Sequence, residues 1–317
     1  MTESIKIGIS ACLLGEKVRW NGVGSRDPFI TDTLGKFVQW VPVCPEVECG
    51  LPIPRETMRL VGPVEDPRLV TSRSGVDHTE RMQGWIRRRL PELEGEDLVV
   101  GFIFKKDSPS CGLMRVKVYN DSGMPEKKGT GMFAGAFVRH FPRVPVEEDG
   151  RLNDPKLRET FIEQIFTLQR WRQTLDRGRR LGNLVDFHTR HKLLFMAHSP
   201  EHYRQAGRLV AGGKKKPASA LFDEYETLLL ETLRRKTTIK KQINVLQHML
   251  GYFKQNLGPD EKQEVLELVD LYRRELVPLI VPLTLINHFV RKYGQPYLAQ
   301  QVYLNPHPVE LKLRNHV

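Results

Sequence analysis

The residues best suited to chemistry are four cysteines, Cys12, Cys44, Cys49 and Cys111, all in the first half of the 317-residue chain. They stand in turn-like segments, SACLLG, VCPEVECG and DSPSCG, where a cysteine used only for packing gains little. The spacing contains no CxxC pair, so it does not predict an ordinary zinc ribbon. Cysteines that serve as small buried apolar residues are one interpretation. Three converging thiolates that leave one metal position open are the other, and soft thiolates favour an iron–sulfur cluster or zinc.

Short apolar runs separated by helical patterns must position these thiols. The runs expected to form strands are 5–10, 41–44, 68–73 and 98–104, and the expected helices are 31–40, 77–90 and 129–141. This β-α-β order predicts an α/β domain with a mostly parallel sheet. Cys12 follows the first strand, Cys44 closes the second, and Cys111 follows the last. Ligands bind at the carboxyl ends of such strands, so the three thiols are expected to meet at one sheet edge.

The second half of the chain reads as an all-α domain. The polar segment VPVEEDG (144–150) is interpreted as a connector, which gives predicted domains of 1–148 and 149–317. Asn153 or Asp154 is expected to cap the first long helix, with Pro155 at its first position. The expected helices are 153–171, 183–197, 200–211, 218–235, 238–256, 260–276 and 279–293.

The positive charge of the chain is concentrated in this second half. Residues 1–150 carry 21 basic and 21 acidic side chains, whereas residues 151–317 carry 28 basic and 17 acidic ones. The residues expected to contact RNA phosphates are Lys214, Lys215, Lys216, Arg234, Arg235, Lys240 and Lys241. Aromatic residues such as Trp171 and Tyr203 are interleaved with the basic ones and are suited to stacking an unpaired base. This pattern predicts salt-dependent RNA binding, although a charge run also serves as an ordinary solvated face.

No membrane segment is expected in this sequence. The longest apolar run, 276–286, is interrupted by two prolines and is shorter than a membrane span. The N-terminus has no signal-peptide pattern. We therefore expect a cytoplasmic protein without disulfides.

Four motifs resemble those of the TudS-type thiouracil desulfidase family. They are SACLLG (10–15), VRWNG (18–22), CPEVECGLPIPR (44–55) and KKDSPSCG (105–112), and the resemblance covers about residues 4–145. Residues 186–211 and the helices that follow resemble the helical YbgA-like domain. The fusion is similar to RudS-type proteins, which remove sulfur from 4-thiouridine in tRNA.

The resemblance implies a cofactor and roles for particular residues. Cys12, Cys44 and Cys111 match the cysteines that hold a 4Fe–4S cluster in the family, whose fourth iron is open to the substrate sulfur. Glu46 matches the catalytic carboxylate. Ser108 is the best match for the catalytic serine.

Other positions in the motifs allow more than one role. Ser10 and Ser110 compete with Ser108 for the serine role and, with Asn21, are expected in the substrate pocket. Cys49 stands where the family pattern has glycine. It would serve either as a small residue, or as a further thiol that reaches the cluster or accepts sulfur. In VRWNG, Trp20 and Asn21 replace the expected Tyr and Asp, which removes an acid.

Together these features predict a non-redox desulfidase that converts thiolated uridine in tRNA, above all 4-thiouridine, to uridine and hydrosulfide. The cluster would act as a Lewis acid on sulfur, and Glu46 would serve as the base toward water. The alternatives are a desulfidase for free thiouracil or 2-thiouridine, and a zinc-holding RNA-binding protein without catalysis.

Overall fold

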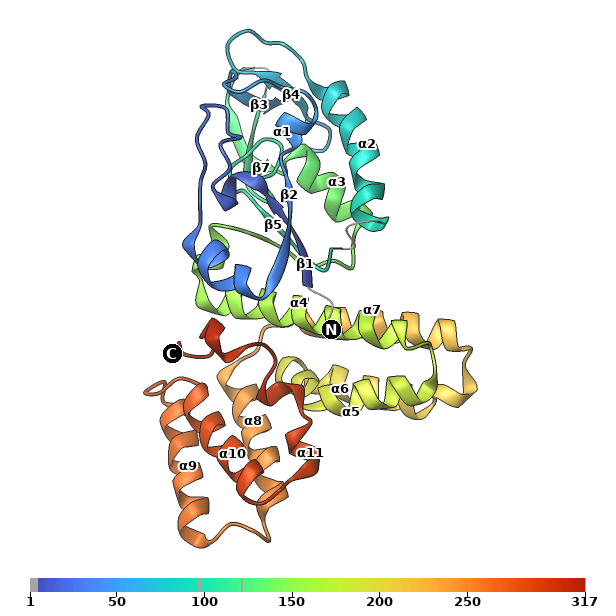
Figure 1. Ribbon diagram of the computed structural model, residues 1–317, viewed down its shortest axis with the longest axis vertical. Coiled ribbons are helices and arrows are strands. Elements are labelled where there is room, and N and C mark those ends of the chain that lie inside the picture. Colours follow the sequence, from blue (N-terminus) through green and yellow to red (C-terminus); the bar gives the residue numbers. More distant parts are fainter. Residues whose placement is uncertain (1–4, 96–98, 121, 317) are drawn as a thin grey trace. The chain divides into compact units, whose positions relative to one another are not determined.

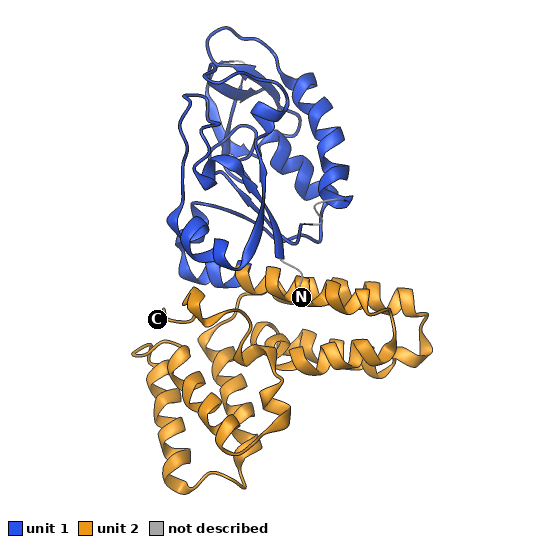
Figure 2. Ribbon diagram, viewed as in Figure 1, with its two compact units in different colours: residues 1–161 blue, residues 162–317 orange. Residues whose placement is uncertain are grey.

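Two compact units make up the chain. A computed structural model describes residues 5–95, 99–120 and 122–316, and it divides into units of residues 1–161 and 162–317 (Figure 2). The division falls inside one long helix, α4 (Pro155–Asp176), which continues from the first unit into the second. The sequence-based boundary at 148–149 precedes this helix.

A four-stranded parallel sheet forms the centre of the first unit. Its strand order is β2-β1-β5-β8, and every neighbouring pair is parallel. The strands are β1 (Ile5–Ser10), β2 (Val38–Val43), β5 (Phe102–Phe104) and β8 (Val146–Glu148). The predicted mostly parallel α/β sheet is confirmed, and its first three strands are adjacent, as convergence of the thiols requires.

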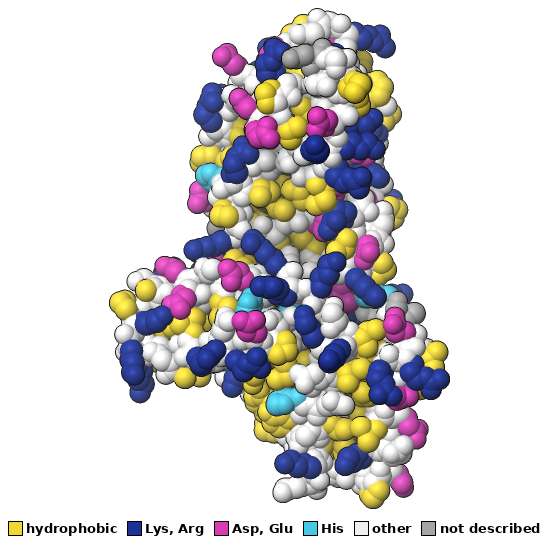
Figure 3. All heavy atoms as spheres, turned by 180° about the vertical axis from the view of Figure 1, so that it is seen from behind, with side chains coloured by type: hydrophobic (Ala, Val, Ile, Leu, Met, Phe, Trp, Pro, Cys, Tyr) yellow, Lys and Arg dark blue, Asp and Glu magenta, His cyan; other side chains and the backbone are white. Residues whose placement is uncertain are grey.

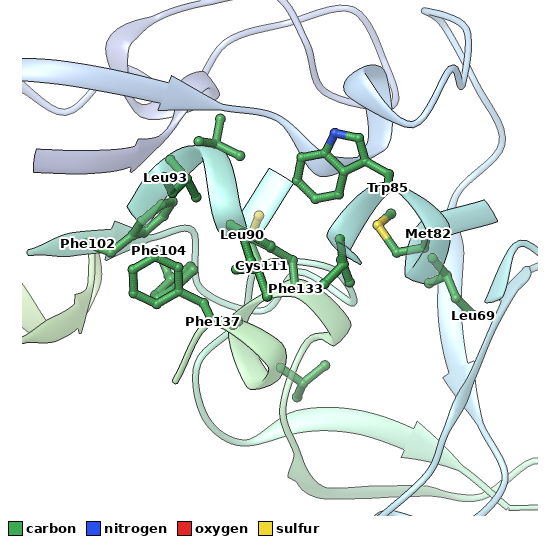
Figure 4. Packing of buried hydrophobic residues seen from close by; sticks show 14 of the residues in the cluster. Leu69, Met82, Trp85, Leu90, Leu93, Phe102, Phe104, Cys111, Phe133 and Phe137 are labelled. Atoms are coloured by element: carbon green, nitrogen blue, oxygen red, sulfur yellow. The ribbon is translucent and has the colours of Figure 1, made fainter. Parts of the chain in front are cut away.

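Aromatic packing holds the helices against this sheet. The Phe102 and Phe104 rings stack at 4.2 Å and contact Phe133 and Phe137 of α3 (Met132–His140), while Trp85 of α2 (Thr79–Gly95) packs on Phe133. Figure 4 shows these rings in one cluster with Cys111 among them. Gly8 of β1 permits this packing, because a Cβ there would lie 2.2 Å from the Phe102 ring.

A second, mixed sheet was not predicted. Its order is β4-β3-β6-β7, with one parallel pair between two antiparallel ones. The strands are β3 (Met58–Val61), β4 (Arg68–Thr71), β6 (Val116–Tyr119) and β7 (Pro125–Gly129). Only β4 was expected from the sequence, because the others are short and β7 exposes four of its five residues.

Four local predictions for the first unit were wrong in extent or type. The expected helix 31–40 is two short helical turns, Phe29–Thr33 and Leu34–Lys36, followed by β2. Helix α2 continues through Pro91 to Gly95, with Leu90 and Leu93 buried in the core. The strand expected over 98–104 is reduced to β5, and residue 98 lies outside the described residues. The presumed connector 144–150 contains β8, an edge strand of the main sheet.

The second unit is helical, as predicted. Its helices after α4 are α5 (Leu181–His198), α6 (Pro200–Ala211), α7 (Ala218–Leu233), α8 (Ile239–Leu250), α9 (Pro259–Arg273), α10 (Ile280–Lys292) and α11 (Pro296–Ala299) (Figure 1). Asp154 caps α4 by accepting from the amides of Lys156 and Leu157, which confirms one of the two expected caps. Within the described residues, no helix is both long and apolar enough to span a bilayer.

Candidate active site

Three cysteines line one cavity at the carboxyl ends of adjacent strands. Cys12 lies in a short helical turn after β1, Cys44 precedes the short helix α1 (Pro45–Glu48) after β2, and Cys111 lies in the loop after β5. All three border a cavity of about 280 Å³. The fold therefore brings together thiols from three distant parts of the sequence, as the strand order predicted.

The surroundings of the thiols disfavour the free thiolate. Burial raises the pKa of Cys12 and of Cys44 to about 11, and it raises the pKa of Cys111 further, because Cys111 belongs to the hydrophobic cluster. The positive charges of Lys105 and Arg19 act in the opposite direction on Cys12. Buried thiols of this kind become good ligands once a metal centre compensates their charge.

This donor set fits an iron–sulfur cluster. All four cysteines are free of disulfides. Across the described part of the chain, no three His, Cys, Asp or Glu side chains are grouped closely enough to bind one metal ion. Three soft thiol donors around one cavity suit an iron–sulfur cluster, which is held by cysteine thiolates.

Cys49 is not among the residues that line the cavity. It follows α1, where its Sγ donates to the Glu46 carbonyl at 3.2 Å and packs against the hydrophobic core. Burial raises its pKa as well. This position favours the interpretation of Cys49 as a small packing residue.

Glu46 lies beside the thiols and is fixed on both carboxylate oxygens. Its Oε1 accepts from Ser110 Oγ at 2.7 Å, and its Oε2 accepts from Arg55 Nε at 2.8 Å and from Arg55 Nη2. Arg55 also donates to the Val18 carbonyl at 2.8 Å, so one guanidinium joins two walls of the cavity. Sequence reasoning gave Arg55 no role, although it closes the CPEVECGLPIPR motif.

Two serines extend this network toward Cys111. The Oγ of Ser108 accepts from the amides of Ser110 and Cys111, at 3.3 and 3.1 Å, and lies 3.0 Å from Ser110 Oγ. Since Ser110 donates its one proton to Glu46, the Ser108 hydroxyl must donate to Ser110. Both serines line the cavity, but Ser110, at 1% exposure, is the one that contacts the carboxylate.

Ser10 also lines the cavity, whereas Asn21 is not among its lining residues. Ser10 Oγ accepts from the Lys105 amide at 2.9 Å, and its hydrogen bond to Cys111 acts to lower the pKa of that thiol. Asn21 is exposed and accepts from the Val23 amide at 3.4 Å. Of the pocket residues expected from sequence, the structure thus gathers Ser10 and Ser110 at the thiols and leaves Asn21 aside.

Two acids near the end of β8 hold the loop that carries Cys111. Glu148 Oε1 accepts from the amides of Leu113 and Met114, at 2.7 and 3.2 Å. Asp149 accepts from the Lys106 amide at 2.8 Å and from Lys105 Nζ at 2.5 Å. These acids anchor the cysteine loop at both ends. The sequence did not predict this function, because their polar segment was interpreted as a connector.

The residues expected to contact RNA differ in how they are engaged within the second unit. Lys214 and Lys215 are exposed, Lys216 is paired with Glu224, and Lys241 Nζ donates to the His198 and Lys236 carbonyls. Arg234, Arg235 and Lys240 are exposed. Lys214, Lys215, Arg234, Arg235 and Lys240 are therefore all exposed, whereas Lys216 and Lys241 are engaged within the unit.

Two family models match separate parts of the chain. The 2-thiouracil desulfurase model matches residues 7–149, and the model of a protein of unknown function, DUF1722, matches residues 192–308. The predicted pairing of a desulfidase domain with a YbgA-like domain is confirmed by these matches.

Two individual proteins are also similar to this chain. Uncharacterized protein YbgA of Escherichia coli (strain K12) is 30% identical over 165 residues, which cover 52% of this chain and 98% of that protein. A solved structure described as the [4Fe-4S]-dependent thiouracil desulfidase TudS is 30% identical and covers 47% of this chain and 94% of its own, with a TM-score of 0.39. By the match to YbgA the chain belongs to the YbgA family, and its 2-thiouracil desulfurase match precedes its DUF1722 match in the sequence.

Proposed function

We propose that this protein is an iron–sulfur-dependent desulfidase that removes sulfur from thiolated uridine in tRNA, with 4-thiouridine as its substrate. The observation that carries the proposal is one cavity that joins three buried thiols to a carboxylate fixed by an arginine and a serine. Membership of the desulfurase family supports the broader activity on thiouracil. The tRNA substrate is the finer part of the proposal.

Cys12, Cys44 and Cys111 would hold the 4Fe–4S cluster. When bound, such a cluster supplies an open thiophilic iron that polarises the thiocarbonyl sulfur as a Lewis acid. Glu48 helps to position Cys44, one of these three ligands, because its Oε1 accepts from the Cys44 amide at 2.7 Å.

Glu46 serves as the base toward water. Arg55 holds the carboxylate in one orientation, since it donates two hydrogen bonds to Oε2 from a buried position. Water adds its oxygen to the ring carbon and gives one proton to Glu46. The second water proton passes to the sulfur, the C–S bond breaks as the carbonyl bond forms, and the sulfur leaves as hydrosulfide. No electron is gained or lost by the chain in this step.

Ser110 is the serine that assists this proton transfer. Its hydroxyl donates directly to Glu46. Ser108, which motif position favoured, donates to the Ser110 hydroxyl instead. Ser108 accepts two backbone amides and so also fixes the turn that presents Cys111. We therefore assign proton relay to Ser110 and support of that relay to Ser108.

The second unit would bind the tRNA body. Basic side chains outnumber acidic ones on the face of the helical unit drawn in Figure 3, in keeping with 28 basic and 17 acidic residues after position 150. Contacts to phosphates of this kind are salt-dependent and largely independent of sequence. The thiolated base would leave its stack to enter the cavity.

Free thiouracil is the second candidate substrate. It is favoured by the match of the 2-thiouracil desulfurase model, which covers residues 7–149. In that case the helical unit would have a separate role.

Absorbance of 4-thiouridine in the near ultraviolet tests the proposal. The protein is loaded with iron and sulfide without oxygen and mixed with bulk tRNA, with Cys111→Ala as the control. We expect the band to disappear only with the intact protein, and faster for tRNA than for equimolar free 4-thiouracil. Conversion of the free base alone would support the second candidate, and no loss of either band would contradict both.

A further inference from the structure

Trp20 is exposed at the wall of the active-site cavity. It lines the cavity beside Arg19 and Cys44, yet 45% of its surface is accessible. Trp85 and Trp171, by contrast, are buried in the cores of their units. A large indole exposed beside reactive groups is suited to contact with a flat ligand.

Arg55 fixes Trp20 relative to the catalytic carboxylate. The Trp20 carbonyl accepts from the Arg55 amide at 2.8 Å, while the Arg55 side chain holds Glu46 and the Val18 carbonyl. Just beyond Trp20 the chain turns at Gly22, whose φ of 73° favours glycine and whose amide donates to the Arg19 carbonyl. The backbone that carries the Trp20 indole is therefore hydrogen-bonded to Arg55, which also holds the Glu46 carboxylate.

We infer that Trp20 is the stacking platform for the pyrimidine ring of the substrate, a role that rests on the proposed function. A uracil ring is flat and has a π-face, and base–aromatic stacking contributes to binding without requiring hydrogen bonds to the base. Stacking on Trp20 leaves the edge of the ring free to direct its sulfur toward the thiols and its carbon toward Glu46. Because stacking recognises the ring rather than its sulfur, Trp20 also binds the uracil product.

This last property allows binding to be measured apart from catalysis. Equilibrium dialysis of uridine against the cluster-loaded full chain compares wild type with Trp20→Ala and Trp20→Phe, and kcat and KM for the thiolated substrate are measured on the same samples. The control is Met124→Ala, which removes an exposed apolar side chain that does not line the cavity.

Stacking predicts a Kd for uridine that is about ten- to a hundredfold higher in Trp20→Ala. KM should rise in parallel with little change in kcat, Trp20→Phe should recover most of the affinity, and Met124→Ala should match wild type. An unchanged Kd in Trp20→Ala, or no uridine binding by wild type, would overturn the stacking role. Uridine binding that depends on Trp20, without turnover of any thiolated base, would instead support the platform and contradict the proposed function.

Discussion

Ser110 and Glu46 are joined by a hydrogen bond of 2.7 Å although they lie 64 positions apart in the sequence. Ser110 comes from the loop after β5, and Glu46 comes from the short helix after β2. The bond thus links the Cys111 loop to the segment of Cys44, and the same two segments supply two thiols and the two groups to which we assign proton transfer.

Removal of any one of the three cavity thiols should abolish cluster loading. Cys12→Ala, Cys44→Ala and Cys111→Ala each leave two protein ligands, so iron and sulfide content after reconstitution should fall close to background. Cys49→Ser is the matched control and should load normally, since Cys49 is not among the lining residues. Stoichiometric iron in Cys111→Ala would show that the ligands are assigned wrongly.

Glu46→Gln should keep the cluster and lose turnover by about 10²- to 10⁴-fold, the usual contribution of a general base. The loss of turnover in Ser110→Ala should lie at the lower end of this range, because the change removes the hydroxyl that donates to the carboxylate. Ser108→Ala should lose less turnover than Ser110→Ala. Single-turnover rates with equal iron content give the comparison, and a larger loss in Ser108→Ala would reverse the two assignments.

Acid should destabilise the helical unit. Burial lowers the pKa of His188 to about 4 and of His191 to about 3, whereas both regain a value of about 6.5 in the unfolded chain. Between the folded and unfolded pKa values the unfolded chain binds more protons than the folded chain. The stability that neutral histidines contribute is therefore complete above about pH 6.5 and is lost as the pH falls below it.

From pH 7 to pH 5 the loss should be on the order of 1–2 kcal/mol for each histidine. The urea midpoint of the far-ultraviolet circular dichroism transition should therefore be lower at pH 5. His191→Phe removes one titrating group and should therefore reduce the difference between the urea midpoints measured at pH 7 and at pH 5. A midpoint that does not change with pH would contradict the burial of neutral histidines.

The loop at Lys214 and Lys215 should contribute to tRNA affinity through charge. A double change of both residues to Ala should weaken binding and reduce the slope of log K against log salt by roughly one to two units. Lys216→Ala should have a smaller effect, because Glu224 already pairs with that ammonium group. Filter binding over a salt series measures these slopes. Identical slopes for wild type and the double variant would show that the loop does not contact tRNA phosphates.

The features that the sequence predicted well are those set by local pattern. IKIGIS is a buried apolar run, and the strand Ile5–Ser10 follows it residue for residue. The helices of the second unit have long amphipathic repeats and clear caps or breaks, so their existence was predictable. The convergence of Cys12, Cys44 and Cys111 followed from parallel strand order alone.

Other features depend on partners that are distant in the sequence. Glu148 and Asp149 read as a polar connector, yet both are buried because backbone amides and Lys105 satisfy them. Arg55 acquires its role only when the fold brings Glu46 and Val18 to it. The motif favoured Ser108 over Ser110, and only their hydrogen-bond partners in the fold identify Ser110 as the serine that contacts Glu46.

Quantification of both products tests the proposed desulfidation of tRNA most directly. Cluster-loaded protein is incubated with tRNA without oxygen, the tRNA is digested to nucleosides, and uridine gained and hydrosulfide released are quantified against 4-thiouridine lost. We expect one uridine and one hydrosulfide for each 4-thiouridine, with neither product formed by Glu46→Gln in the same time. Unchanged 4-thiouridine in the presence of a fully loaded cluster would contradict the proposed desulfidation.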